Sequence, residues 1–290
     1  MGIDLKYHIT SLIAIFLSLG IGILVGSALI PNTTLIERQN AIISRLEKDF
    51  AKIRQESRRV QKEVELSHRF EKESLPLLIA DRLKGVRVAI VGTNEENSSF
   101  IQNDLTQVLE QAGVEISSIT IIKKRFGLQE EDKKLRIYAH LGVEEEDSSK
   151  VAPGIAGRLS KEIARGGDSS LLSYLQEMKV LYSKGDYNLP TPVVILVGGS
   201  SEKKSLEAQF VDLPMIRIFK GLKVRIIGVE KVKVETSYVR YYQQEDLSTV
   251  DNIDTIAGQV ALIYVLEGRE GNFGVKEPAS SLLPKWEGSS

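Results

Sequence analysis

Cysteine is absent from this chain of 290 residues, and other residues that bind soft metals are scarce. Without a thiol the chain can form no disulfide bond, thiolate metal site or thiol nucleophile. The chain has three histidines and three methionines, and none of them forms a local HxH or MxxM pair. They are His8, His68, His140, Met1, Met178 and Met215. The residues therefore predict no dedicated copper site and no cofactor, and they leave any metal ligands unknown.

An excess of charge of one sign is also lacking. The chain has 38 Lys and Arg against 39 Asp and Glu, a formal net charge of −1. Nucleic-acid-binding domains carry a basic patch or stripe, so we expect no nucleic-acid partner. Three scattered histidines offer no pairing of nucleophile and base, and we expect the protein not to be an enzyme.

Charge is missing altogether from Ile9 to Ile30, a run of 22 residues. As a helix this run would reach roughly 33 Å, enough to cross a hydrocarbon core of about 30 Å. The alternative is a cleaved signal peptide, with small residues at Gly26-Ser27-Ala28 as its cleavage site. Secretory apolar regions are shorter, about 7–15 residues, so we favour an uncleaved membrane anchor.

Small residues recur at every fourth position of this run. Because helix association in lipid depends on close backbone packing, one stripe of small residues predicts a packing face within the membrane. The alternative is that Gly and Ala are simply common in membrane helices. The predicted packing residues are Ala14, Ser18, Gly22 and Gly26.

From Thr34 to about Glu73 the chain has no Pro or Gly and is densely charged. Apolar residues occupy seven of ten seam positions over five heptads, and the exceptions are Gln39, Ser57 and Ser67. This narrow seam predicts a coiled coil and, with the membrane stripe, a parallel homodimer. The alternative is a long amphipathic helix packed on its own domain. The seam residues are Ile36, Ile43, Leu46, Phe50, Ile53, Val60 and Val64.

The remaining chain predicts an α/β domain. Short apolar runs predict buried strands, and helical spacing separates several of them. This alternation predicts a mostly parallel, Rossmann-like sheet with helices on both faces. The expected strands are 85–92, 114–122, 192–199, 223–229 and 259–266, and the expected helices are 100–111, 155–165 and 169–179. The expected parts are tail and anchor 1–31, coiled-coil helix 32–75, α/β domain 76–270 and loose tail 271–290.

Several polar segments are candidate sites. The loops Val91–Asn94 and Gly198–Ser201 follow buried strands and could present backbone N–H groups to an anion, but neither matches a phosphate-binding motif. We favour strand-to-helix turns there. Asp246, Asp251 and Asp254 could hold a hard cation, although capping of turns is the favoured role. The run 144–147 is expected to be a solvated loop.

A second set of candidates is aromatic. Tyr238, Tyr241 and Tyr242 lie close together in the sequence. Tyrosine is enriched at protein interfaces, which makes this group a candidate interaction surface. The alternative is one face of a strand.

The order of these segments resembles the mycobacterial-type copper transport protein B family of copper transporters. The segments that carry the resemblance are YHITSLIAIFLSLGIGILVGSALI, KGVRVAIVG and LSTVDNIDTIAGQVALIYVL, and it spans essentially the whole chain. The resemblance implies a bacterial envelope protein with one N-terminal span and a role in copper transport or homeostasis. It assigns no copper ligand to any residue.

Three functions remain open from the sequence. The first is the copper-transport role that the resemblance implies, in which copper is possible as a bound ion although the ligand inventory does not support it. The second is a coiled-coil structural or regulatory protein of the cell envelope, which controls wall or division factors and binds a second envelope protein. The third is an α/β domain that binds an anionic small molecule at the strand ends.

The apolar run also predicts topology. A basic-residue count on its flanks, with Lys6 before it and Arg38, Arg45 and Lys48 after it, would place the C-terminal side inside. Long domains translocate largely regardless of charge, so we expect a bacterial cell-membrane protein with an extracytoplasmic domain. A periplasm-active reporter fused after Lys285 should be active and a cytoplasm-active one silent. The reverse pattern would overturn this orientation.

Overall fold

A computed structural model describes residues 5–29, 33–143 and 148–285 of the chain. These residues fall into two compact units, Met1–His68 and Arg69–Ser290. The predicted loop at 144–147 lies outside the described residues, as does the segment 286–290 of the predicted tail.

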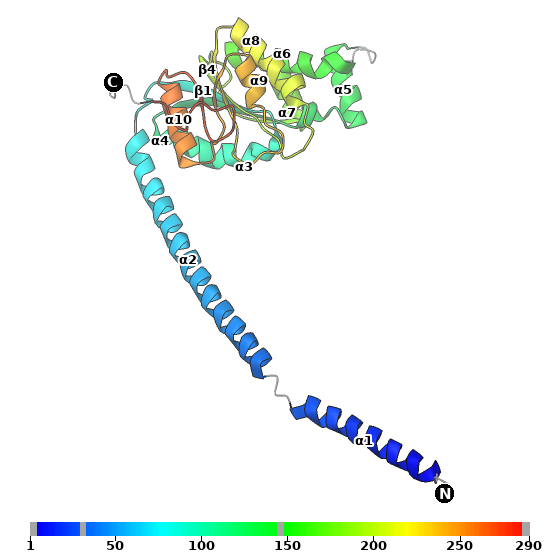
Figure 1. Cartoon of the computed structure of the whole chain (residues 1–290). Coiled ribbons are helices and arrows are strands. Elements are labelled where there is room, and N and C mark those ends of the chain that lie inside the picture. The colour runs from blue at the N-terminus through cyan, green and yellow to red at the C-terminus, as the bar shows by residue number, and fades with distance from the viewer. Residues whose placement is uncertain (1–4, 30–32, 144–147, 286–290) are drawn as a thin grey trace. The chain divides into compact units, whose positions relative to one another are not determined.

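Two helices account for the N-terminal unit (Figure 1). Helix α1, Leu5–Leu29, contains a window from Lys6 to Ala28 that is long and apolar enough to cross a membrane. Helix α2 runs from Thr33 to Ile79 and extends past Pro76 into the second unit. The predicted order of an apolar helix followed by a long charged helix is confirmed.

The second unit is built on a seven-stranded sheet. The strand order is β3-β2-β1-β4-β5-β6-β7, and every neighbouring pair is parallel except β2 with β3. Strand β1 therefore lies between β2, which follows it in the chain, and β4, which follows β3. The strands are β1 Arg87–Gly92, β2 Glu115–Ile122, β3 Leu181–Gly185, β4 Val193–Val197, β5 Arg225–Val229, β6 Ser248–Val250 and β7 Asn272–Phe273.

Helices cover both faces of the sheet, which confirms the predicted α/β class (Figure 1). One core lies under α5, α6, α7, α8 and α9, and the other lies under the end of α2, α4 and α10. Strands buried on both faces need apolar side chains at successive positions, as in the run Val193–Val197. The helices are α3 Ser98–Phe100, α4 Thr106–Gln111, α5 Glu131–Leu141, α6 Ser148–Arg165, α7 Ser170–Glu177, α8 Leu213–Gly221, α9 Val239–Gln244 and α10 Ile256–Leu266.

Short irregular helices connect these elements. Short 3₁₀ segments occur at Glu95–Asn97 and Lys124–Gly127, and π-helical turns occur at Ile101–Leu105 and Ala208–Asp212. Each π-turn is continuous with an α-helix, so one extra residue shifts the face that the following helix presents.

The strand expected at 259–266 is wrong, because these residues belong to α10. Thr255 caps the helix, its Oγ1 accepting from the Gly258 N–H at 3.1 Å. The segment is apolar on nearly all sides and largely buried, and a short apolar run without a polar face has no period that separates helix from strand.

The expectation of a loose tail fails for residues 271–285. Strand β7 pairs in parallel with β6, and Phe273 also forms a bridge with Ser281. The Asp251 carboxylate accepts from the backbone N–H groups of Val275, at 2.7 Å, and Lys276, at 3.1 Å. The chain is therefore held here by a side chain far away in sequence.

One strand glycine gives a test of this packing. A Cβ on Gly228 in β5 would overlap the buried ring of Tyr242. Gly228→Ala should lower the free energy of unfolding by about 1–3 kcal/mol, because overpacking forces neighbours out of their minima. Gly154→Ala is the control, since α6 leaves open space there and alanine should stabilise that helix by up to roughly 1 kcal/mol. Chemical unfolding midpoints of the two variants measure the difference, and equal midpoints would refute the close packing.

Candidate functional site

The stripe of small residues lies along α1. Around Gly22 and Gly26 no heavy atom lies within 4 Å of a position where a Cβ would be, so both leave room for a neighbouring helix. The Ser18 hydroxyl donates to the Ile15 carbonyl oxygen at 2.9 Å, so its polar group is satisfied within its own helix. Packing through Ala14, Ser18, Gly22 and Gly26 stays a prediction.

All seven predicted seam residues lie on α2, and all are exposed within one chain. Their exposed fractions run from 46% at Val60 to 63% at Ile53. Apolar side chains aligned on a solvated helix would be buried by a partner. The coiled coil itself stays a prediction.

The carboxyl ends of β1 and β4 are where an α/β sheet of this topology would bind a ligand. Here that place is filled by side chains and backbone. The Asn97 amide donates to the Gly198 carbonyl at 3.1 Å, and the Ser201 N–H donates to the Glu96 carboxylate at 2.9 Å. Asn97 and Ser200 are buried. The loops 91–94 and 198–201 thus act as turns between elements, the role that the sequence favoured.

Beneath these loops lies a buried carboxyl that the sequence analysis missed. Asp212 ends the π-turn Ala208–Asp212 and is fully buried. Its Oδ2 accepts hydrogen bonds from the hydroxyls of Tyr242 and Thr93, the latter at 3.1 Å, while Oδ1 has no partner. Burial raises the pKa of Asp212 to about 7, although the two hydrogen bonds lower it. Its only sequence signal was an aspartate within the apolar run Phe210–Leu213.

A second buried carboxylate lies in the same region. The Glu207 carboxylate accepts from the Arg125 backbone N–H at 3.0 Å, and its other oxygen lies 3.4 Å from Arg125 Nε. Burial raises the pKa of Glu207, and the nearby Arg125 opposes that shift. The negative charge of Glu207 also raises the pKa of Asp212. Both carboxylates lie in the interior of the domain and not at its surface, since Asp212 is fully buried and Glu207 is only 2% exposed.

The tyrosine candidates do not form a surface. Tyr238, just before α9, and Tyr242, within it, are both fully buried. Their rings lie edge to face, with the ring centroids 6.5 Å apart. Tyr241 is only partly buried and packs against the same core. The candidate interface role therefore fails for Tyr238 and Tyr242, and the strand alternative is wrong as well.

The predicted acidic cluster is used for turns. Asp251 caps residues 275 and 276, and Asp254 Oδ1 accepts from the Val232 N–H at 2.8 Å. Asp246 is exposed and holds a left-handed turn with φ of 53°. Among the residues that the structure describes, no group of three or more His, Asp or Glu side chains is arranged to hold a metal ion.

The histidines also stand apart along the chain. His8 is exposed on α1, His68 on α2, and His140 near the end of α5, where its ring stacks on Tyr174 at 3.6 Å. Met178 and Met215 are buried in the core. The histidines were expected to be surface residues, and all three are exposed.

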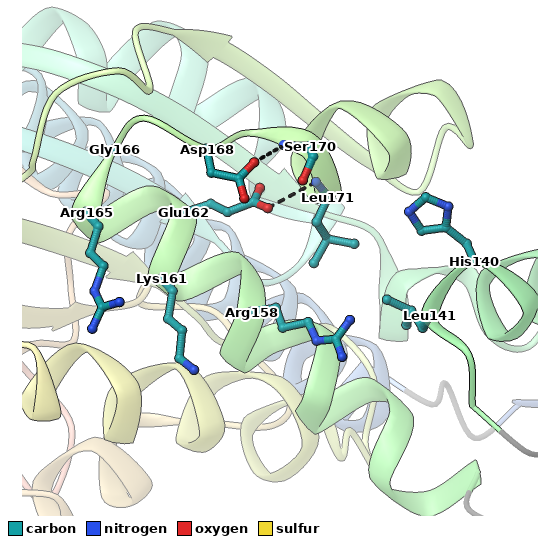
Figure 2. Close-up of a pocket in the computed structure, with 10 residues that line it drawn as sticks. All are labelled: His140, Leu141, Arg158, Lys161, Glu162, Arg165, Gly166, Asp168, Ser170 and Leu171. Atoms are coloured by element: carbon teal, nitrogen blue, oxygen red, sulfur yellow. Dashed lines mark hydrogen bonds between the residues drawn. The ribbon is translucent and has the colours of Figure 1, made fainter.

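A surface pocket of about 410 Å³ lies between α5, α6 and the start of α7 (Figure 2). Its lining includes charged side chains of both signs. The lining residues are His140, Leu141, Arg158, Lys161, Glu162, Arg165, Gly166, Asp168, Ser170 and Leu171.

The start of α7 is already occupied by carboxylates of the protein. Glu162 accepts from the N–H groups of Leu171, at 3.0 Å, and Leu172, at 2.9 Å, and Asp168 accepts from that of Ser170 at 3.0 Å. These backbone donors are therefore not free for an outside anion. Burial raises the pKa of Glu162, whereas the Ser170 N–H lowers the pKa of Asp168.

The basic side chains of the pocket do not converge on one point. Lys161 and Arg165 extend away from the carboxylates of Glu162 and Asp168 (Figure 2). The pocket is thus a place of mixed charge that is open to solvent. It fits neither a copper ligand set, which needs soft or imidazole donors close together, nor a convergent anion site.

A comparison with known families gave one match. The family model described as "Copper transport outer membrane protein, MctB" matches residues 2–284, nearly the whole chain. No curated protein matches the chain. The match extends across the apolar helix α1, the long helix α2 and the α/β domain.

The Asp212 carboxyl predicts a pH-dependent stability. Its pKa in the folded state, about 7, lies above the ordinary 3.8, so the folded state binds the proton more tightly. The free energy of unfolding should therefore fall as pH rises from about 4 to about 7, by at most roughly 1.4 kcal/mol per unit. Asp212→Asn should flatten this slope, because an amide stays neutral.

The matched control is Asp246→Asn, since Asp246 is exposed and asparagine tolerates its left-handed turn. Urea unfolding at several pH values measures both variants. A slope unchanged by Asp212→Asn, or one lost with Asp246→Asn, would contradict the assignment.

Proposed function

This chain belongs to the copper transport outer membrane protein family, and we propose that it serves copper transport as a membrane-anchored protein that works in more than one copy. The observation that carries the proposal is the family match over residues 2–284. The match covers the apolar helix, the long helix and the α/β domain together, so the proposal concerns the whole chain rather than one domain.

Copper enters this proposal as cargo and not as a resident ion. Copper(I) prefers thiolate and thioether ligands, and copper(II) prefers imidazole. The chain has no cysteine, and Met178 and Met215 are buried. The ligands that meet copper would then come from surfaces shared between copies or from a partner protein. His8 is the one imidazole beside the apolar helix, and pairing of two chains would bring two copies of it close.

A conduit also needs more than one chain. Helix α1 is a single apolar helix, exposed on all sides where its side chains are described. One helix encloses no path for an ion, because its interior is filled by its own backbone. Close packing through Gly22 and Gly26 would let several copies, or a partner, build one.

The proposed location follows from α1. We place α1 in a bacterial membrane as a single span and the α/β domain on the extracytoplasmic side. The family description refers to the outer membrane, and the apolar helix supports membrane attachment.

Loss of the gene tests the transport function directly. Deletion should change the cellular copper content and the copper tolerance of the bacterium while leaving zinc content unchanged, and the wild-type chain should restore both. Elemental analysis of washed cells measures this. Unchanged copper in the deletion strain would overturn the transport function and favour the structural or regulatory role in the envelope.

A second measurement tests whether copper is cargo. The purified full-length protein in detergent should compete for copper(I) no better than a membrane protein of similar Met and His content that is unrelated to copper. The reason is the absence of thiolates and of a clustered donor set. Tight binding with a whole-number stoichiometry per chain would show that a resident site exists.

A further inference from the structure

Helix α2 is long, but most of its length is exposed within one chain. Its side chains from Ile36 to Phe70 are exposed within one chain. In proteins, most of the stability of a helix comes from packing of its apolar face. This stretch has no such packing within one chain. The seven seam residues supply such a face.

Charges beside the seam distinguish the ways in which two such helices could pair. With Ile36, Ile43, Phe50 and Val64 at the first core position of the heptad, Asp49, Glu56 and Glu63 occupy the g position. The e position is held by Glu47, Arg54 and Gln61. In a parallel pair, each g residue faces the e residue of the next heptad on the other helix.

Parallel pairing places Asp49 opposite Arg54 and Glu56 opposite Gln61. Neither Asp49 nor Arg54 has an ion pair or hydrogen bond with any other described residue of its own chain. Glu56 and Glu63 are already engaged by Arg59 of the same helix, at 2.6 Å and 2.9 Å. Asp49 and Arg54 are therefore the complementary charges left for a second helix.

Other arrangements lose this complementarity. An antiparallel pair brings g positions against g positions, and three of the four g residues between Ile36 and Val64 are acidic, the fourth being Ile42. In a parallel pair shifted by one heptad, one Asp49 faces Gln61 and the other faces Glu47, while one Arg54 faces Ile42 and the other faces Glu56. Only the parallel, in-register pair gives Asp49 an opposite charge on both sides of the seam.

We propose that α2 pairs with α2 of a second copy of this chain as a parallel, in-register coiled coil, oriented by the ion pair of Asp49 with Arg54 of the other copy. This inference rests on the proposed function in one respect, because a conduit built from several copies requires those copies to assemble. The symmetric pair contains this ion pair twice, once on each side of the apolar seam.

The absence of cysteine allows a direct test in the full-length chain. Leu46→Cys and Ile53→Cys, made separately, each place one thiol in the seam. In native membranes treated with tetrathionate, which avoids copper as the oxidant, both should form disulfide-linked dimers. An antiparallel pair has one crossing point and can link at most one of the two positions to itself. Lys48→Cys is the control, since position 48 faces outward and should link little.

Charge reversal tests the ion pair itself. Asp49→Arg and Arg54→Asp should each weaken dimer formation on the order of tenfold, because two attractive pairs become repulsive. The double variant should recover to within about threefold of the wild type. Arg58→Asp is the control, since this outward position should change association little. Sedimentation in detergent measures dimer formation.

The outcomes separate this inference from the transport function. No linkage at either seam position, or linkage at only one, would overturn the parallel coil. A double variant no better than the single ones would overturn the Asp49–Arg54 pair. A copper phenotype on gene deletion without seam linkage would reject the coil and keep the transport function, whereas linkage without the phenotype would do the reverse.

Discussion

The pairing of β1 with β4 at the centre of the sheet is the constraint on which the rest of the α/β unit depends. Both strands are parallel and buried on both faces, so each must return through a helix that covers one face. The chain forms β2 and β3 on one side of β1 and then β4 to β7 on the other, and helices on both faces give two cores instead of one. The helices are thus needed to cover the apolar side chains on both faces of these two strands.

The same topology creates a place at the strand ends that many α/β proteins use for ligands, and this protein closes it. Gly198 and Gly228 lack side chains, and the Tyr242 ring occupies the space that they leave. The tyrosine hydroxyl in turn donates to one oxygen of the Asp212 carboxyl, whose pKa is raised by burial.

Helix α2 has two different roles along its length. Near its end, Leu75 and Ile79 are buried in the core of the domain, so the helix is anchored there by ordinary packing. Earlier, the seam residues from Ile36 to Val64 are exposed within one chain. The helix is therefore continuous from an exposed apolar seam into the core of the domain.

The sequence by itself determined the features that depend on local composition and period: the apolar helix within Ile9–Ile30, the long charged helix after it, and strands such as Val193–Val197. It also identified the family, because the order of these segments spans the chain. The tertiary structure alone decided that Gln259–Leu266 is helical, that Asn272–Phe273 pairs with the sheet, and that Asp212 lies buried under Tyr242. An all-apolar run carries no period, and burial of one carboxyl depends on residues over a hundred positions away, such as Thr93. These outcomes depend on contacts through space, and no local pattern of residues contains them.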